Sequence, residues 1–200
     1  MHSVLDFAHV LATRGLEAGD IAVDATTGNG HDTVALARAV GAEGQVFGID
    51  VQADALDSTE DRLVDEGLEG PVTLLHAGHE HLADHLPSRV HGQVGAVMFN
   101  LGYLPGSAST LTTTPDTTIP ALDAAMGVLR PGGVATVVLY TGHEGGADEA
   151  EAVDEWAAAL PQEQFRALSY RFVNQRNDPP RLVAVEKRAD GEAGTTDPAA

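Results

Sequence analysis

Short apolar runs alternate with segments of helical periodicity along most of the chain. The first segment, residues 3–14, repeats apolar side chains at the three- and four-residue spacing of one helix face. The apolar runs of strand length lie at 21–25, 45–50, 71–76, 93–100 and 134–140. The helical segments between and after them lie at 31–40, 52–66, 79–86, 117–129 and 147–159. This alternation predicts a parallel sheet with helices on both faces.

The C-terminal part of the chain interrupts the alternation. Residues 164–173 and 181–187 have strand character, and no helical segment separates them. They predict two antiparallel strands joined by the loop NQRNDPP. The sum is an α/β, Rossmann-like fold, with a seven-stranded, mostly parallel sheet and a C-terminal antiparallel hairpin, which is the usual plan of class I S-adenosylmethionine (SAM) methyltransferases. In such folds ligands bind at the carboxyl ends of the strands.

Length and composition set further bounds. The chain has 200 residues, and 43% of them are hydrophobic. We expect a single domain over residues 1–188 and a disordered tail over 189–200, which has no large apolar side chains to bury. No signal peptide and no membrane-spanning run is evident, so the cytoplasm is the expected location. The sequence leaves open whether the chain forms a homodimer.

The charge of the chain is strongly acidic. Thirty acidic and 11 basic residues give a formal net charge of -19, which argues against a surface that grips nucleic acid indiscriminately. Six of the basic residues nevertheless fall between 166 and 188, where the local charge is +4. That segment is either an RNA contact or an ordinary solvated face. The absence of cysteine excludes disulfides, thiolate zinc sites and a cysteine nucleophile.

The turn after the first strand is rich in glycine and begins with an acid. It reads Asp24-Ala25-Thr26-Thr27-Gly28-Asn29-Gly30, and glycines there let the backbone approach a ligand closely. The dinucleotide pattern G-x-G-x-x-G fails because Thr33 stands at its third glycine. Asp24 would also repel a pyrophosphate. The turn therefore suits a cationic ligand, or it is only a tight connection.

The second strand ends in Asp50, and Gln52 follows closely. A carboxylate at this place can accept both hydroxyls of a ribose, as in NAD and SAM enzymes. The alternative is a solvated strand end or an N-cap for the next helix.

The fourth strand ends in Asn100-Leu101-Gly102-Tyr103. This corner resembles the N-P-P-Y motif of methyltransferases that act on nitrogen, although Leu101 replaces a proline. An amine substrate needs acceptors that hold its N–H bonds and aim its lone pair at the methyl group, and an aromatic ring can stack on it. The alternative is an Asx-turn that leaves the strand.

A protonated amine must also lose a proton before it can accept a methyl group. The candidate bases at the predicted ligand edge are His31, Asp32 and His143, and the sequence does not choose among them. His79 opens the helix after the third strand, where adenine lies in methyltransferases. Neither zinc-protease spacing nor a thiolate set is present, so no metal is expected.

The motifs occur together in an order that resembles the MnmM family, earlier labelled rRNA methylases. The matching stretches are DATTGNGHDT (24–33), GIDVQ (48–52), HE (79–80), FNLGYLPG (99–106), TT and AL (117–118, 121–122), YTGHEGG (140–146) and NQRNDPP (174–180). The resemblance covers roughly residues 3–188. It implies a SAM-dependent enzyme that converts 5-aminomethyl-2-thiouridine to 5-methylaminomethyl-2-thiouridine at the wobble position of tRNA.

The resemblance also implies residue roles. The residues that it places around SAM are Asp24, Thr26, Gly28, Asn29, Gly30, Asp50, Gln52, His79, Asn100 and Leu101. Those that it places on the substrate side are Asn100, Tyr103, Tyr140, Gly142 and His143. The family commonly has an acid and a lysine after LPG, where this chain has Ser107-Ala108-Ser109, so no role of that lysine carries over.

Three other functions remain at this stage. The first is a SAM enzyme that acts on ribosomal RNA or a small-molecule amine, which the acidity favours. The second is a non-catalytic nucleotide-binding module, which the intact Asn100–Tyr103 corner disfavours. The third, an NAD oxidoreductase, is disfavoured by Thr33 and by the terminal hairpin.

Overall fold

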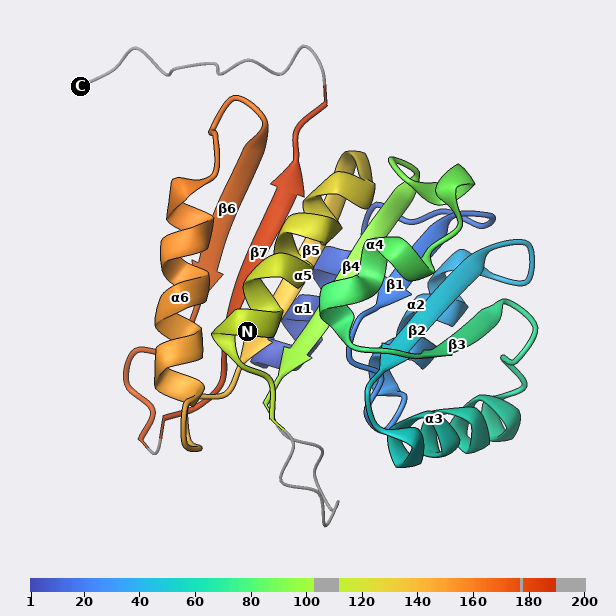
Figure 1. The fold of residues 1–200 in the computed structure, drawn as a ribbon, viewed down its shortest axis with the longest axis horizontal. Helices are drawn as coiled ribbons and strands as arrows, with labels where there is room; N and C mark the ends of the chain where they lie inside the picture. The colour runs from blue at the N-terminus through green and yellow to red at the C-terminus, as the bar shows by residue number, and fades with distance from the viewer. Residues whose placement is uncertain (103–111, 177, 190–200) are drawn as a thin grey trace.

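One sheet of seven strands organises the protein (Figure 1). The computed structural model describes residues 1–102, 112–176 and 178–189. The strand order is β3-β2-β1-β4-β5-β7-β6. The strands are β1 (Ile21–Asp24), β2 (Gln45–Asp50), β3 (Val72–His76), β4 (Val94–Leu101), β5 (Leu129–Leu139), β6 (Phe165–Tyr170) and β7 (Arg181–Lys187).

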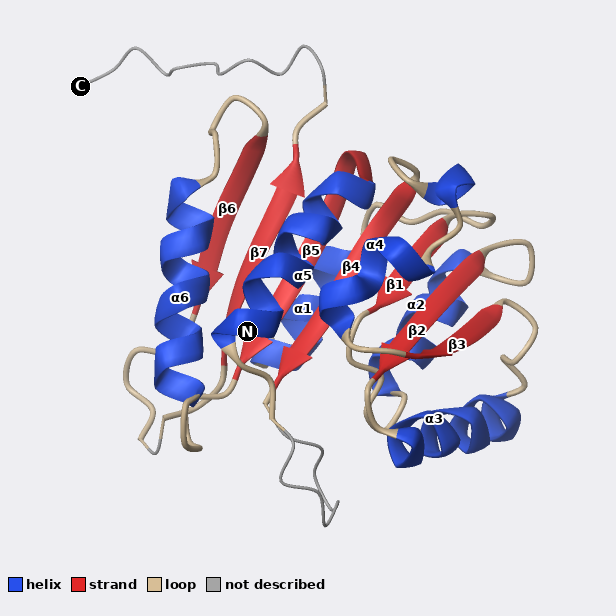
Figure 2. Cartoon of the chain, viewed as in Figure 1, coloured by secondary structure: helices blue, strands red, loops and turns tan. Residues whose placement is uncertain are grey.

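Six helices and two single 3₁₀ turns are seen in the described ranges (Figure 2). They are α1 (Val4–Thr13), α2 (His31–Val40), α3 (Ala53–Glu66), η1 (His79–His81), α4 (Leu82–His85), η2 (Ser88–Val90), α5 (Pro115–Val128) and α6 (Gly146–Ala159). Within the described residues, no helix has both the length and the apolar character needed to cross a membrane.

The predicted fold class is confirmed, and the differences are local. The helix predicted over 79–86 is a 3₁₀ turn followed by one α-turn. Helix α5 begins at Pro115, two residues earlier than predicted, because proline suits the first helical position, where no N–H partner is needed. Strand β5 begins at Leu129, which pairs with Val94, and a bulge then separates it from the next pair.

Strand β7 runs against its neighbours. It pairs antiparallel with β5 on one side and with β6 on the other. Arg181, the first residue of β7, pairs with Leu139, the last residue of β5. The described residues of the β6–β7 connection, 171–176 and 178–180, therefore lie at the same edge of the sheet as the carboxyl ends of the parallel strands.

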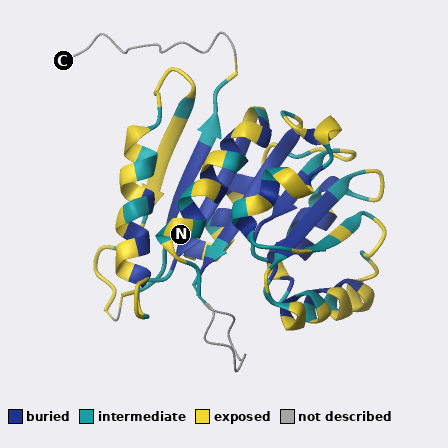
Figure 3. Cartoon of the chain, in the orientation of Figure 1, coloured by how far each residue is buried: buried dark blue, intermediate teal, exposed yellow. Residues whose placement is uncertain are grey.

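Two apolar clusters cover the two faces of the sheet. Figure 3 shows the central strands coloured as buried. Strand β4 shows why, because successive side chains of a strand point to opposite faces. Phe99 packs with α4, α5 and α6, whereas Met98 packs with α1 and α2. Both side chains are almost fully buried, as a sheet covered on both faces requires.

The leading helix α1 is anchored on the face of the sheet that includes Met98. Its buried residues are Val4, Ala8, Leu11 and Ala12. The ring of Phe7 lies 4.6 Å from that of Tyr170, whose hydroxyl donates to the His2 carbonyl at 2.8 Å. This anchoring fixes which face of α1 is turned toward the carboxyl edge of the sheet.

Candidate active site

A cavity of about 700 Å³ opens at the carboxyl edge of the sheet. The strand order reverses between β1 and β4, which is where ligands bind in open α/β sheets. Residues that follow β1, β2, β3, β4 and β5 all contribute to its wall, and α1 closes one side. The volume falls in the range of small-molecule and cofactor sites.

Asp24 stabilises the glycine-rich turn through hydrogen bonds within the protein interior. Its carboxylate is fully buried and accepts from Thr33 Oγ1 at 2.5 Å and from the backbone N–H of Thr26 at 3.2 Å. Burial, and then the charge of nearby Asp32, raises the pKa of Asp24 to about 7. Asp24 therefore shapes the turn, and it is not part of the cavity wall.

Asp50 holds the turn from the other side. Its Oδ2 accepts from the backbone N–H of Gly28 at 3.0 Å, and its Oδ1 accepts from that of Gln52 at 2.9 Å. Each carboxylate oxygen has two lone pairs, so the group retains acceptor capacity toward the cavity. Asp50 and Gln52 both line the wall.

Helix α3 buttresses the tip of the turn. Thr59 Oγ1 donates to the Gly28 carbonyl at 3.2 Å, and Arg62 Nε donates to the Asn29 carbonyl at 2.5 Å. Gly30 has φ +77°, and a Cβ there would come within 3.0 Å of Thr59 Cα. Only glycine meets both conditions without strain.

Asn100 is held by two hydrogen bonds near the end of β4. Its backbone N–H donates to Thr26 Oγ1 at 2.7 Å, and its side-chain Nδ2 donates to Asp32 Oδ2. Its Oδ1 is buried and has no hydrogen-bond partner among the described residues. Such an atom is costly to leave unmatched, and Asn100 is one of the residues that line the cavity.

His9 completes this cluster from α1. Its Nε2 lies 2.6 Å from Asp32 Oδ1, so the three side chains His9, Asp32 and Asn100 form one chain of contacts. The hydrogen bond and charge of Asp32 raise the pKa of His9 against an opposing effect of burial.

His79 lies in a less solvent-exposed part of the cavity wall. It is buried, and its ring meets that of Phe99 edge-on, with centroids 6.0 Å apart. Burial lowers the pKa of His79, so the neutral imidazole is favoured there. A neutral ring against an apolar floor suits contact with another flat ring.

A buried carboxylate supports the opposite wall. Glu149, in α6, accepts from Thr113 Oγ1 at 2.8 Å and from Thr118 Oγ1 at 2.6 Å. Thr113 Oγ1 in turn accepts from the Gly102 N–H at 2.9 Å. Half-buried Tyr140 lies nearby in the wall, and burial together with the Asp32 charge raises its pKa.

The structure brings most of the predicted site residues together. Those that line the cavity are Thr26, Gly28, Asn29, His31, Asp32, Asp50, Gln52, His79, Asn100, Leu101 and Tyr140. Asp24 and Gly30 are not among the residues that line the cavity. His143 is also outside the lining, packed beside Gly102 and Gly146. Tyr103 lies outside the described residues.

Sequence reasoning missed His9 and Glu149. The available signal for His9 was its spacing with Leu5 and Asp6 on one side of the leading helix, since all three line the cavity. Nothing local indicated which strand that helix would cross.

The basic segment 166–188 is less available for RNA than its charge suggested. Lys187 Nζ donates to the carbonyls of Met126 and Leu129 at 2.9 and 2.8 Å, and Arg181 pairs with Asp154 at 2.6 Å. Arg171 and Arg176 are exposed in the β6–β7 connection, at the carboxyl edge of the sheet.

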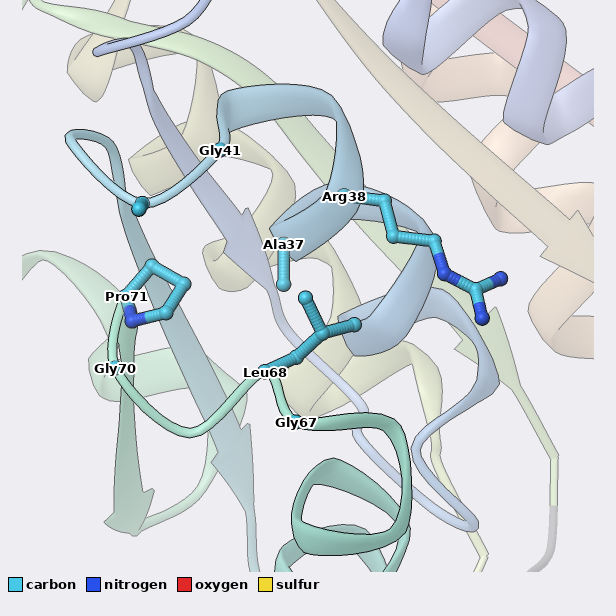
Figure 4. A pocket seen from close by; sticks show the side chains of 8 residues that line it. Ala37, Arg38, Gly41, Gly67, Leu68, Gly70 and Pro71 are labelled. Atoms are coloured by element: carbon cyan, nitrogen blue, oxygen red, sulfur yellow. The ribbon is translucent and has the colours of Figure 1, made fainter.

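A second hollow of about 340 Å³ lies at the opposite edge of the sheet (Figure 4). Leu68 points toward Ala37 across it, and the Arg38 side chain extends away. Arg38 instead pairs with Glu66 at 2.6 Å. The hollow offers no paired acid and base, and no group of three or more metal-ligating side chains occurs within the described ranges.

Comparison with known proteins identifies the family. Residues 46–186 match the model of the family described as "Putative rRNA methylase". The chain belongs to this family. It is 37% identical over 191 residues to the chloroplastic tRNA (mnm(5)s(2)U34)-methyltransferase of Arabidopsis thaliana, covering 92% of this chain and 69% of that one. The predicted family relationship is thus confirmed.

Solved structures of this family have the same fold. An rRNA-methylase structure from Clostridium thermocellum matches with TM-score 0.89 and 42% identity, over 94% of this chain and 98% of that one. A methyltransferase from Streptococcus mutans, solved in complex with SAH, matches with TM-score 0.83 and 32% identity, over 94% and 99%. The chain is a SAM-dependent methyltransferase of the Rossmann-like class.

The donor set of the cavity fits SAM. Carboxylates at Asp50 and Asp32 suit a ligand that carries ribose hydroxyls and a positive charge, and buried His79 suits a flat base.

Proposed function

We propose that this methyltransferase acts on the amino nitrogen of 5-aminomethyl-2-thiouridine at the wobble position of tRNA, and forms 5-methylaminomethyl-2-thiouridine. The observation that carries the proposal is the Asn100 corner, whose buried Oδ1 offers an acceptor to an N–H donor in the cavity. The name of the Arabidopsis relative, which specifies mnm(5)s(2)U34 in tRNA, supports the nucleoside and its position.

The residues of the corner suit an amine, which has N–H donors, rather than a ring carbon. Asn100 Oδ1 can accept one N–H of the amine and so direct the nitrogen lone pair. Because Asn100 Nδ2 is already committed to Asp32, the amide presents its oxygen, and not its N–H groups, to the substrate. The Asp32 carboxylate, which also lines the cavity, would attract the ammonium form as it approaches. The ammonium must then give up a proton before the nitrogen lone pair can accept the methyl group.

The cofactor side has a separate set of residues. SAM supplies an electrophilic methyl group on a sulfonium that is already a good leaving group. Asp50 would accept from the ribose hydroxyls while Gly28 and Gln52 keep its carboxylate oriented. His79 and Leu101 would bound the base and the methyl-bearing region of the cavity.

The test is nucleoside mass spectrometry after incubation of the purified protein with SAM and tRNA that carries 5-aminomethyl-2-thiouridine. The expected result is a gain of one methyl group on that nucleoside. Asn100→Ala should abolish the gain while SAM binding, measured by calorimetry, persists. Asp50→Ala should weaken SAM binding itself. Absence of a methyl gain in a wild-type protein that binds SAM would overturn the proposed substrate.

A second candidate follows from the charge. A net charge of -19 and the internal use of Arg181 and Lys187 favour a substrate smaller or less anionic than tRNA, such as a small-molecule amine. Ribosomal RNA is the other acceptor that the family description suggests. Competition of each acceptor with the modified tRNA in the same assay separates these possibilities.

A further inference from the structure

We infer that His9 is a positioning residue for methyl transfer, which acts through Asp32 to set the orientation of the Asn100 side-chain amide. The inference rests on the proposed function only in its kinetic test, which uses the proposed substrate. Its structural part concerns contacts within the chain.

Three elements meet at this point of the cavity. His9 lies on α1, Asp32 in the first turn of α2, and Asn100 near the end of β4. His9 Nε2 is 2.6 Å from Asp32 Oδ1, and Asp32 Oδ2 accepts from Asn100 Nδ2. All three residues line the cavity, so the chain of contacts ends at the substrate position.

The orientation of the Asn100 amide needs such an external constraint. The last torsion of asparagine is broad and roughly two-fold, so rotation by half a turn exchanges the amide oxygen and nitrogen at little intrinsic cost. A flipped amide would present N–H groups to the cavity, where they would oppose the N–H groups of an amine. Asp32 Oδ2 prevents this exchange because a carboxylate accepts and does not donate.

His9 determines which Asp32 oxygen accepts the hydrogen bond from Asn100. Its Nε2 occupies Oδ1, and this contact leaves Oδ2 for Asn100. The Asp32 side chain is only 7% exposed, so water offers little replacement for the imidazole. The raised pKa of His9 agrees with a favourable contact to a carboxylate.

The kinetic experiment compares His9→Ala and His9→Gln with a control on the same helix, Val10→Ala. Val10 is 41% exposed and is not part of the cavity wall. We expect His9→Ala to lower kcat by about 10- to 100-fold, because a misdirected acceptor spoils alignment, while the Kd for SAM changes little. His9→Gln, whose amide nitrogen can donate to Asp32, should recover most of kcat. Val10→Ala should match the wild type.

Two kinetic results would overturn the inference. One is a kcat for His9→Ala within twofold of the wild type. The other is a His9→Gln variant as slow as His9→Ala, since restoring the donor would then not restore the function. The melting temperature of each variant shows whether a change in kcat comes instead from loss of the fold.

A second readout does not need the substrate. The Asn100 side-chain NH₂ signal, assigned in ¹⁵N NMR spectra by its loss in Asn100→Ala, should shift in His9→Ala and stay in place in Val10→Ala. An unmoved signal would overturn the inference. If the wild type fails to methylate 5-aminomethyl-2-thiouridine, the proposed substrate is wrong, and this signal still decides whether His9 orients Asn100.

Discussion

Asn100 donates its side-chain amide to the carboxylate of Asp32, a residue 68 positions earlier in the chain. The two meet because β4 and β1 are adjacent parallel strands, and α2 begins just beyond the end of β1. This contact gives the amide a direction, with its nitrogen toward Asp32, and leaves its buried oxygen without a hydrogen-bond partner among the described residues. The chemistry proposed for the site depends on that direction.

Asn100→Asp tests whether the amide, rather than a simple acceptor, is required. The variant keeps an oxygen toward the substrate but replaces a donor to Asp32 with a second carboxylate, and two adjacent carboxylates repel each other. We expect kcat to fall by about 100-fold or more near neutral pH, the scale of losing one oriented polar group in an active site. Single-turnover methyl transfer measures this, with the SAM dissociation constant as the control. Wild-type activity in Asn100→Asp would contradict the assigned direction of the amide.

Asp24 should make the stability of the protein depend on pH. Burial raises its folded-state pKa to about 7, above the ordinary value of 3.8, so the fold favours the protonated acid. Its contribution is fully present below about pH 4 and is lost as the pH rises through 7. Removing the acid in Asp24→Asn should therefore flatten the curve of unfolding free energy against pH between 4 and 7, by up to about 1.4 kcal/mol per pH unit.

Urea unfolding at a series of pH values measures this effect. The matched control is Asp57→Asn, because Asp57 is exposed on α3. The control should leave the pH dependence of the wild type in place. If Asp24→Asn and Asp57→Asn give parallel curves, Asp24 does not carry the buried proton.

Gly30→Ala tests the approach of α3 to the glycine-rich turn. Gly30 and Gly67 both have positive φ, +77° and +65°, so alanine pays a similar backbone cost at each, about 1 kcal/mol. Only at Gly30 would the new Cβ also meet Thr59, at 3.0 Å from its Cα, whereas Gly67 has open space. We expect Gly30→Ala to lose at least about 1 kcal/mol more than Gly67→Ala in denaturant unfolding. Equal losses would mean that the turn and α3 separate freely.

Lys187 and Arg176 should behave differently although both belong to the basic segment. Lys187→Met removes two contacts to backbone carbonyls and should cost about 2 kcal/mol of stability, with little effect on tRNA affinity. Arg176→Ala should leave stability unchanged, weaken tRNA binding and reduce the salt slope of that binding by about one. Filter binding at several salt concentrations, alongside thermal melting, distinguishes them. The reverse pattern would place the RNA contact on β7 itself.

Much of the fold was readable from local sequence. Strands β2 and β7 have the bounds predicted for them, and both are apolar runs with a clear stop on each side. The prediction for β5 was less accurate, because its first residue belongs to the strand only through pairing with Val94 across a bulge. Pairing partners are not visible in a local pattern.

The sequence by itself determined the alternation of strands and helices, the family, and the residues that end each strand, because these follow from short-range periodicity and from motifs. Tertiary structure alone decided that α1 crosses to the cavity and brings His9 against Asp32, 23 positions away. It also decided that Lys187 faces the carbonyls of Met126 and Leu129 instead of solvent. The physical reason is that periodicity shows which side of an element is buried, whereas packing between distant elements determines what that side meets.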